Sequence, residues 1–128
     1  MKIKAIKIDV TKLQVYEITL DSDDLQTYYD AIGNGCTTFE CPIQMRPYYD
    51  EWEGGSDGFF CDGEIMLRWA DVVGGFALPG FKQPLINNAI IVGSDKMGEA
   101  RDHRQNIEVI KRSVQFFAYN GPKDYNLN

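Results

Sequence analysis

The four apolar residues Ala89–Val92 constrain the fold of this chain more than any other stretch. The run contains two isoleucines and a valine, and Gly93 and the turn-forming residues Ser94–Gly98 follow it. A short, uninterrupted apolar run rich in β-branched residues is typical of a strand that is covered on both faces. We therefore expect a central strand here, with sheet partners and a covering helix supplied by the preceding residues.

The length and net charge of the chain limit the number of domains and the kinds of partner that it can have. A length of 128 residues predicts one domain spanning 1–128, and a hydrophobic fraction of 44% is enough for a core. The net charge of -6 makes direct nucleic-acid binding unlikely and argues against anionic membranes, because phosphate affinity comes mainly from clustered Lys and Arg. No apolar run approaches the roughly 18 residues that a membrane span needs. Residues 1–8 alternate charged and apolar side chains, unlike a signal peptide, so we expect a cytoplasmic protein.

The three cysteines, Cys36, Cys41 and Cys61, do not have the spacing of a metal site. A zinc site would need His103 as its fourth ligand, but Cys36 and Cys41 are five residues apart and would point to opposite faces of a strand. An odd number of cysteines without an export signal indicates reduced, buried thiols. We expect no metal and no cofactor.

Alternating polarity predicts most of the sheet. The predicted strands are Lys2–Asp9, Leu13–Leu20, Cys36–Met45, Phe59–Cys61, Glu64–Trp69 and the central strand. The first two form a hairpin, and Pro42 places the third at a sheet edge or a bulge. Asp62-Gly63 favours a type I′ turn that would join the fourth and fifth strands.

Two helices are expected to cover one face of this sheet. The first spans 22–33, capped by Asp21 or Ser22, and the second spans 103–119, with Asp102 as its cap and Gln105 completing a capping box. The residues of 71–84 include the large apolar side chains Phe76, Leu78 and Phe81, which indicates a loop laid onto the body, and the tail from about 122 is expected to be flexible. The sequence thus predicts an α+β domain with a mostly antiparallel sheet of five or six strands.

An acidic stretch between residues 47 and 67 is the main functional signal. It contains no basic residue and six acidic ones: Asp50, Glu51, Glu53, Asp57, Asp62 and Glu64. The spacing does not match a calcium loop, and sequence cannot show the apolar pocket that a catalytic carboxylate pair needs. Two interpretations remain open, a solvated loop or a surface that docks on a basic partner.

The docking interpretation assigns definite residues. Exposed aromatic side chains supply binding energy and carboxylates steer a basic partner. The predicted partner-binding residues are Tyr48, Tyr49, Asp50, Glu51, Trp52, Glu53 and Asp57.

The order of elements, with the Gly33-Asn-Gly-Cys36 step, the Asp62-Gly63 turn and the run Asn88-Ala-Ile-Ile-Val-Gly-Ser-Asp-Lys-Met-Gly-Glu99, resembles one family. This is the DUF3846 family of small proteins from phages, plasmids and other mobile elements. The resemblance covers residues 1–104 and implies no catalytic residues. It implies an accessory protein of a mobile element, among which countering host defence is common.

The sequence therefore leads to two functional hypotheses. The first is a non-enzymatic accessory protein of a phage or mobile element that binds a host protein. Its acidic aromatic surface would inhibit a nuclease or CRISPR-type defence by taking the place of nucleic-acid phosphates. The alternative is a small-molecule-binding protein or a small hydrolase that uses a cleft between the 47–58 and 71–84 loops.

Overall fold

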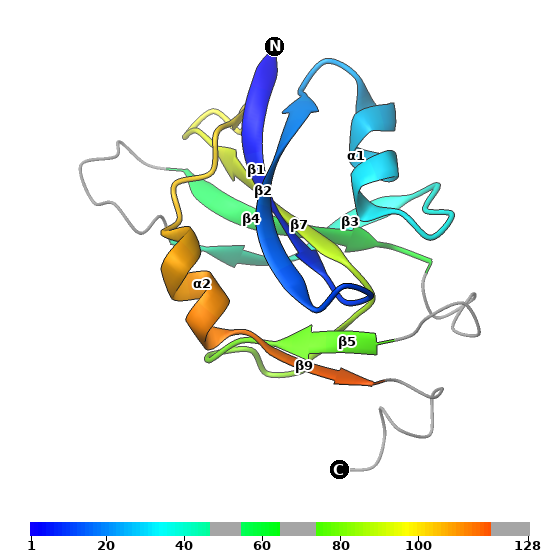
Figure 1. The fold of residues 1–128 in the computed structure, drawn as a ribbon. Helices are drawn as coiled ribbons and strands as arrows, with labels where there is room; N and C mark the ends of the chain where they lie inside the picture. Colours follow the sequence, from blue (N-terminus) through cyan, green and yellow to red (C-terminus); the bar gives the residue numbers. More distant parts are fainter. Residues whose placement is uncertain (47–54, 65–73, 119–128) are drawn as a thin grey trace.

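The apolar run at 89–92 lies in the middle of a six-stranded antiparallel sheet (Figure 1). The computed structural model describes residues 1–46, 55–64 and 74–118. The strand order is β2-β1-β7-β4-β3, and the short β8 pairs with the end of β7. The strands are β1 (Lys2–Asp9), β2 (Gln14–Asp21), β3 (Phe39–Met45), β4 (Ser56–Asp62), β7 (Ala89–Ser94) and β8 (Ala100–Arg101). This confirms the predicted central strand and the predicted antiparallel α+β fold.

A second, three-stranded sheet was not predicted. It has the order β6-β5-β9, with β5 (Gly74–Ala77) between β6 (Leu85–Ile86) and β9 (Gln115–Ala118). Phe76 of β5 is completely buried and Leu78 beyond it is nearly so, so this part of the 71–84 segment does lie on the body as expected. In Figure 1 this sheet lies below the main one, at the end of the molecule that also carries α2.

The two faces of the main sheet bury separate cores. Side chains alternate along β7, so Ala89 and Ile91 join one cluster while Ile90 and Val92 join the other. Helix α1 (Leu25–Ile32) packs on the Ile90 side. Helix α2 (Ile107–Ser113) and the second sheet pack on the Ile91 side. The prediction that both helices cover one face is therefore wrong, because β7 is apolar on both faces and each face needs a cover.

Both helices begin later than predicted. Asp24, not Asp21 or Ser22, caps α1, since its side chain accepts a hydrogen bond from the Gln26 backbone N–H. Asn106, not Asp102, caps α2 in the same way. Each cap side chain satisfies backbone donors that the first helical turn leaves unpaired.

The second helix also ends earlier than predicted. It stops at Val114, whose backbone is extended at φ -71 and ψ 136, and the chain continues into β9. The segment 115–118 pairs along its whole length with β5, so tertiary pairing overrides the helical pattern of its apolar residues.

The turn chemistry of the sheet follows the sequence only in part. The β1–β2 hairpin is confirmed, and so is the edge position of β3, whose register shifts between Glu40 and Ile43, on either side of Pro42. The predicted type I′ turn at Asp62-Gly63 is wrong, because neither residue is among the described residues with positive φ. The Gly63 N–H instead donates to the Thr38 carbonyl and extends the β3–β4 pairing. Most of the predicted strand 64–69 and the tail from 122 lie outside the described residues.

Asn88 joins three elements at the start of β7. It is buried, its Oδ1 accepts a hydrogen bond from the Val10 backbone N–H at 2.8 Å, and its Nδ2 donates to the Ile32 carbonyl at 3.0 Å. One side chain thus satisfies a backbone donor beside the β1–β2 turn and a carbonyl at the end of α1, as buried backbone groups require. No helix in the described parts of the chain is long and apolar enough to cross a membrane.

Candidate functional site

The structure places only one of the predicted partner-binding residues. Tyr48, Tyr49, Asp50, Glu51, Trp52 and Glu53 lie outside the described residues. Asp57 is described, and it is completely buried in β4. Its assignment to a docking surface is therefore wrong, because the strand begins at Ser56 and turns this carboxylate into the protein.

Asp57 is the centre of a buried polar network. Its Oδ1 lies 3.1 Å from Arg104 Nη2 and its Oδ2 accepts hydrogen bonds from the Arg104 backbone N–H at 3.0 Å and from Gln105 Nε2 at 2.8 Å. A buried carboxylate with a cationic partner and several hydrogen bonds can remain charged. Gln105 is thus used in this network and not in a capping box.

Arg104 extends this network to two strands. Its Nη2 donates to the Ser56 carbonyl of β4 at 3.1 Å and to the Ser94 carbonyl of β7 at 2.6 Å. The segment between β8 and α2 is therefore fixed on the ends of two neighbouring strands. We assign this cluster a structural role.

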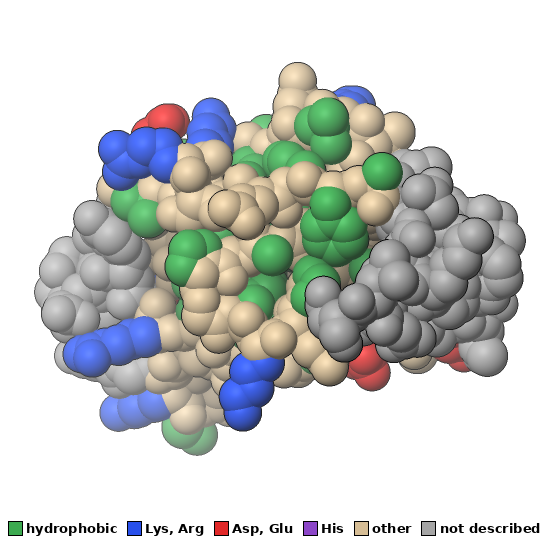
Figure 2. Space-filling view, turned by 90° about the horizontal axis from the view of Figure 1, so that it is seen from below, with side chains coloured by type: hydrophobic (Ala, Val, Ile, Leu, Met, Phe, Trp, Pro, Cys, Tyr) green, Lys and Arg blue, Asp and Glu red, His purple; other side chains and the backbone are tan. Residues whose placement is uncertain are grey.

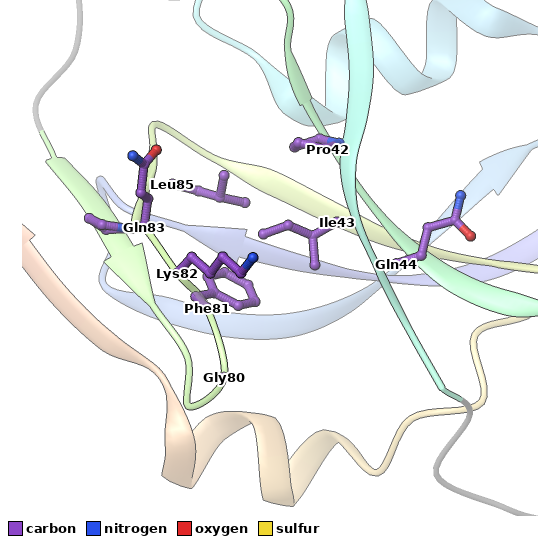
Figure 3. Close-up of a pocket in the computed structure, with 9 residues that line it drawn as sticks. Pro42, Ile43, Gln44, Gly80, Phe81, Lys82, Gln83 and Leu85 are labelled. Carbon is purple, nitrogen blue, oxygen red and sulfur yellow. The ribbon is translucent and has the colours of Figure 1, made fainter.

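A groove lies close to one of the predicted cleft walls (Figure 3). The sequence predicted a cleft between the 47–58 and 71–84 loops. The groove has a volume of about 640 Å³ and runs between Gly80–Leu85 and residues Pro42–Gln44 of β3. The wall formed by Gly80–Leu85 was therefore predicted in part, since it overlaps the 71–84 loop. The other wall is the edge strand β3 and not the 47–58 loop, whose residues 47–54 are outside the described parts.

Three apolar side chains form the floor of this groove, and the core beneath holds them in place. Ile43, Phe81 and Leu85 are partly buried and pack against the core on the second-sheet side. The Phe81 ring meets the Phe59 ring edge to face, with centroids 5.3 Å apart. Among the described residues that line the groove, Lys82 is the one charged side chain.

The single histidine, His103, contacts two neighbouring groups through its ring nitrogens. His103 Nε2 lies 3.0 Å from Glu17 Oε2, and the Gln105 backbone N–H points to His103 Nδ1 at 3.3 Å. Since Nδ1 accepts this hydrogen bond, the neutral ring carries its proton on Nε2 and donates it to the carboxylate. His103 precedes α2 instead of lying in its first turn, and it does not line the groove.

The cysteines are poor nucleophiles. Burial raises the pKa of the Cys61 thiol to about 12, and burial also raises the pKa of Cys41. All three cysteines carry thiols that are outside any disulfide, and Cys36 is buried. A thiol with a raised pKa is protonated at neutral pH and does not attack. Within the described residues no group of three or more His, Cys, Asp or Glu side chains could hold a metal ion.

Acidic residues are concentrated in one part of the chain, more widely than the 47–67 stretch. Twelve of the 19 acidic side chains lie between residues 13 and 67, and of the 13 basic side chains only Arg46 does. The described part of this segment forms β2, α1, β3 and β4. Counting charges from Leu13 instead of from Pro47 would have found this asymmetry in the sequence.

Helix α1 presents part of this acidic segment to solvent. Asp23 is 82% exposed and its carboxylate pairs with the Met1 amine at 2.7 Å, and Asp24 and Asp30 are exposed as well. Leu25, between them in sequence, is 53% exposed, and the same helix has no basic residue in its last turn. We define Asp23, Asp24, Leu25 and Asp30 as the α1 acidic surface.

The end of the molecule that carries the second sheet differs from the α1 acidic surface in its charged side chains. Figure 2 looks at the molecule from below, toward the end that carries the second sheet in Figure 1. Lys and Arg side chains stand around apolar patches over much of this view, and the few visible acidic side chains lie at its upper left and lower right margins. The charges of the chain are therefore unevenly distributed over its surface.

Comparisons of the chain with protein-family models, with curated proteins and with solved structures found no match.

Proposed function

We propose that this chain is a non-enzymatic accessory protein of a phage or mobile genetic element that binds a host protein in the cytoplasm. The observation that carries the proposal is the segregation of charge, with twelve acidic residues and one basic residue between positions 13 and 67. Where carboxylates of this segment are exposed, as on the α1 acidic surface, they steer a basic partner toward that part of the molecule. The resemblance to a family of mobile-element proteins supports the same reading.

The partner we propose is a nuclease of a host defence system, including CRISPR-type effectors. Proteins that hold nucleic acid present clustered Lys and Arg to its phosphates. A protein with carboxylates in place of phosphates can occupy such a surface. The α1 acidic surface supplies carboxylates next to Leu25, and the predicted residues Tyr48–Glu53 supply aromatic anchors.

The test is affinity capture from a bacterial lysate with a matched charge control. Asp23→Asn/Asp30→Asn removes two charges from the α1 acidic surface, and Glu99→Gln/Glu108→Gln removes two from exposed positions elsewhere. We expect a nuclease to be recovered by the wild type and the control, less by the α1 variant, and less as salt rises. Recovery of the same proteins by all three forms, without salt dependence, would contradict the proposal.

The 48–53 segment is tested by a separate variant. If Trp52 anchors the partner, Trp52→Ala should weaken binding by about 2 kcal/mol, as the loss of a hot-spot aromatic does. Thermal unfolding of the free protein should stay unchanged. A variant that binds normally would remove this segment from the interface.

The groove beside β3 favours a second candidate function, the binding of a small molecule. Ligand pockets typically enclose about 300–1,000 Å³, and the groove lies in this range. A hydrolase is less well supported, because Lys82 is the one titratable side chain among the described lining residues and an acid–base pair is missing there. Native mass spectrometry of the purified protein would reveal a retained metabolite.

A further inference from the structure

The groove between Pro42–Gln44 and Gly80–Leu85 has a rigid apolar floor. Ile43, Phe81 and Leu85 each bury part of their side chain in the core and leave the rest toward the groove. The Phe81 ring is also held against Phe76, with centroids 6.1 Å apart, in addition to its contact with Phe59. A floor fixed in this way needs no ordering when a ligand binds, so apolar contact there is not offset by lost freedom.

The positively charged side chain of Lys82 also lines the groove. Figure 3 shows the Lys82 side chain lying alongside the Phe81 ring, with its amine directed toward Ile43 on the β3 side. No carboxylate of the described residues forms an ion pair with Lys82, and the other polar side chains among the described lining residues, Gln44 and Gln83, are neutral. The groove thus combines an apolar surface with an exposed positive charge that can pair with an anionic group of a ligand.

The edge strand beside the groove is unsuited to pairing with a peptide strand. Pro42 has no backbone N–H to donate, and the register of β3 is irregular between Glu40 and Ile43. Proline and bulges are features that block the addition of a further strand to a sheet edge. Recognition in this groove therefore depends on its side chains, which suits a small molecule better than an extended peptide.

We propose that the groove binds a small amphipathic carboxylate, such as an aryl- or alkyl-substituted carboxylic acid. Its apolar part rests on Ile43, Phe81 and Leu85, and its carboxylate pairs with Lys82 Nζ. The combination favours such a ligand over neutral hydrocarbons, which make no contact with the Lys82 charge, and over phosphate-rich ligands, whose several charges a single lysine does not balance. This inference deepens the small-molecule alternative and does not depend on the docking of a host protein.

The test is a titration followed by the backbone amide signals in ¹H–¹⁵N NMR spectra. The probe is 3-phenylpropionate, and the matched controls are 3-phenylpropionamide, which lacks the charge, and acetate, which lacks the ring. We expect saturable shifts of the Ile43, Phe81 and Leu85 amides with 3-phenylpropionate, with a Kd in the millimolar range for a probe of this size. The two controls should bind at least about fivefold more weakly, since each loses one of the two contacts.

A lysine pair provides the matching protein variants. Lys82→Gln should weaken 3-phenylpropionate at least about fivefold, while Lys96→Gln, at an exposed turn lysine, should leave the Kd within about twofold. The spectra also report whether each variant is folded. Shifts confined to other residues, an absence of saturable shifts, or equal binding of the amide or of the Lys82→Gln variant would each overturn the proposal. None of these outcomes affects the capture experiment on the α1 acidic surface.

Discussion

At the scale of single residues, Asp57 carries the densest polar network of the described chain. Asp57→Ala would remove the buried carboxylate that pairs with Arg104 and accepts a hydrogen bond from Gln105, and we expect a loss of about 3–5 kcal/mol in the free energy of unfolding. The matched control is Glu108→Ala, which removes a 69%-exposed partner of Lys111 and should cost no more than about 1 kcal/mol. Urea unfolding measures both. A loss below about 1 kcal/mol for Asp57→Ala would show that the network is not structural.

Asp9 links stability to pH. Burial raises the pKa of its carboxyl, but hydrogen bonds from the Lys12 N–H, the Tyr16 hydroxyl and the Thr11 N–H, with the Lys7 charge, together bring it below its ordinary value of 3.8. A lowered folded-state pKa means that the carboxylate stabilises the fold above the unfolded-state value and that this contribution disappears as pH falls through the folded-state value.

The corresponding prediction concerns the variant Asp9→Asn. We expect it to be less stable than the wild type by about 1–2 kcal/mol at neutral pH, because the hydrogen bonds to the charged group weaken. The difference should shrink as pH falls below the ordinary carboxyl value of 3.8, where the wild-type carboxyl becomes protonated. Urea unfolding at several pH values checks this, and a difference that stays constant to the acid end would contradict the assignment.

At the scale of elements, β7 fixes the main sheet from its centre. Ile91 is completely buried in the core on the second-sheet side, so Ile91→Ala should lower the free energy of unfolding by about 2–5 kcal/mol through lost burial and a residual cavity. Leu25→Ala, at a half-exposed helical site, is the control and should change it by less than about 0.5 kcal/mol. An Ile91→Ala loss as small as that of the control would mean that β7 is not buried in solution.

The second sheet depends on close approach at Gly75. A Cβ at this position would lie 2.5 Å from the Leu85 carbonyl oxygen and 2.8 Å from the Phe117 ring. Gly75→Ala should therefore destabilise the protein by about 1–3 kcal/mol, because β6 and β9 must both shift. Gly63→Ala is the control, since its nearest contacts would be at 3.6 Å. Equal stability of the two variants by thermal unfolding would argue against the packing of β5 between β6 and β9.

Local patterns predicted some of these elements, and long-range pairing decided the others. The β1–β2 hairpin, α1 and β7 each have a periodicity or an apolar run that is visible within a few residues. The apolar residues of 107–118 fit a helix, and only pairing with β5 makes residues 115–118 a strand. Pairing likewise places Asp57 inside β4 opposite Gly93 and brings β3 to the groove, which sequence spacing does not reveal.

At the scale of the whole molecule, the reactivity of the thiols measures how well the folded protein shields its core from solvent. Cys36 and Cys61 are buried and Cys41 is only partly so, and burial raises the pKa of Cys61 to about 12. In the native protein we expect a disulfide reagent at mildly alkaline pH to label Cys41 alone, and slowly, because burial raises its pKa too. All three thiols should react after unfolding. Rapid labelling of Cys61 in native buffer would show that the core around it opens readily.

The place of β7 between β1 and β4 also has a consequence for biosynthesis. The ribosome completes β4 at Asp62 and reaches β7 only at Ala89, which at about 5–20 residues per second is a delay of a few seconds at most. Until then the β1–β2 and β3–β4 pairs have no strand to join them, and β1 and β4 each keep an open hydrogen-bonding edge. During this interval the open edges of β1 and β4 can pair with wrong strands. Synthesis of β7 ends the interval, because β7 pairs with both edges.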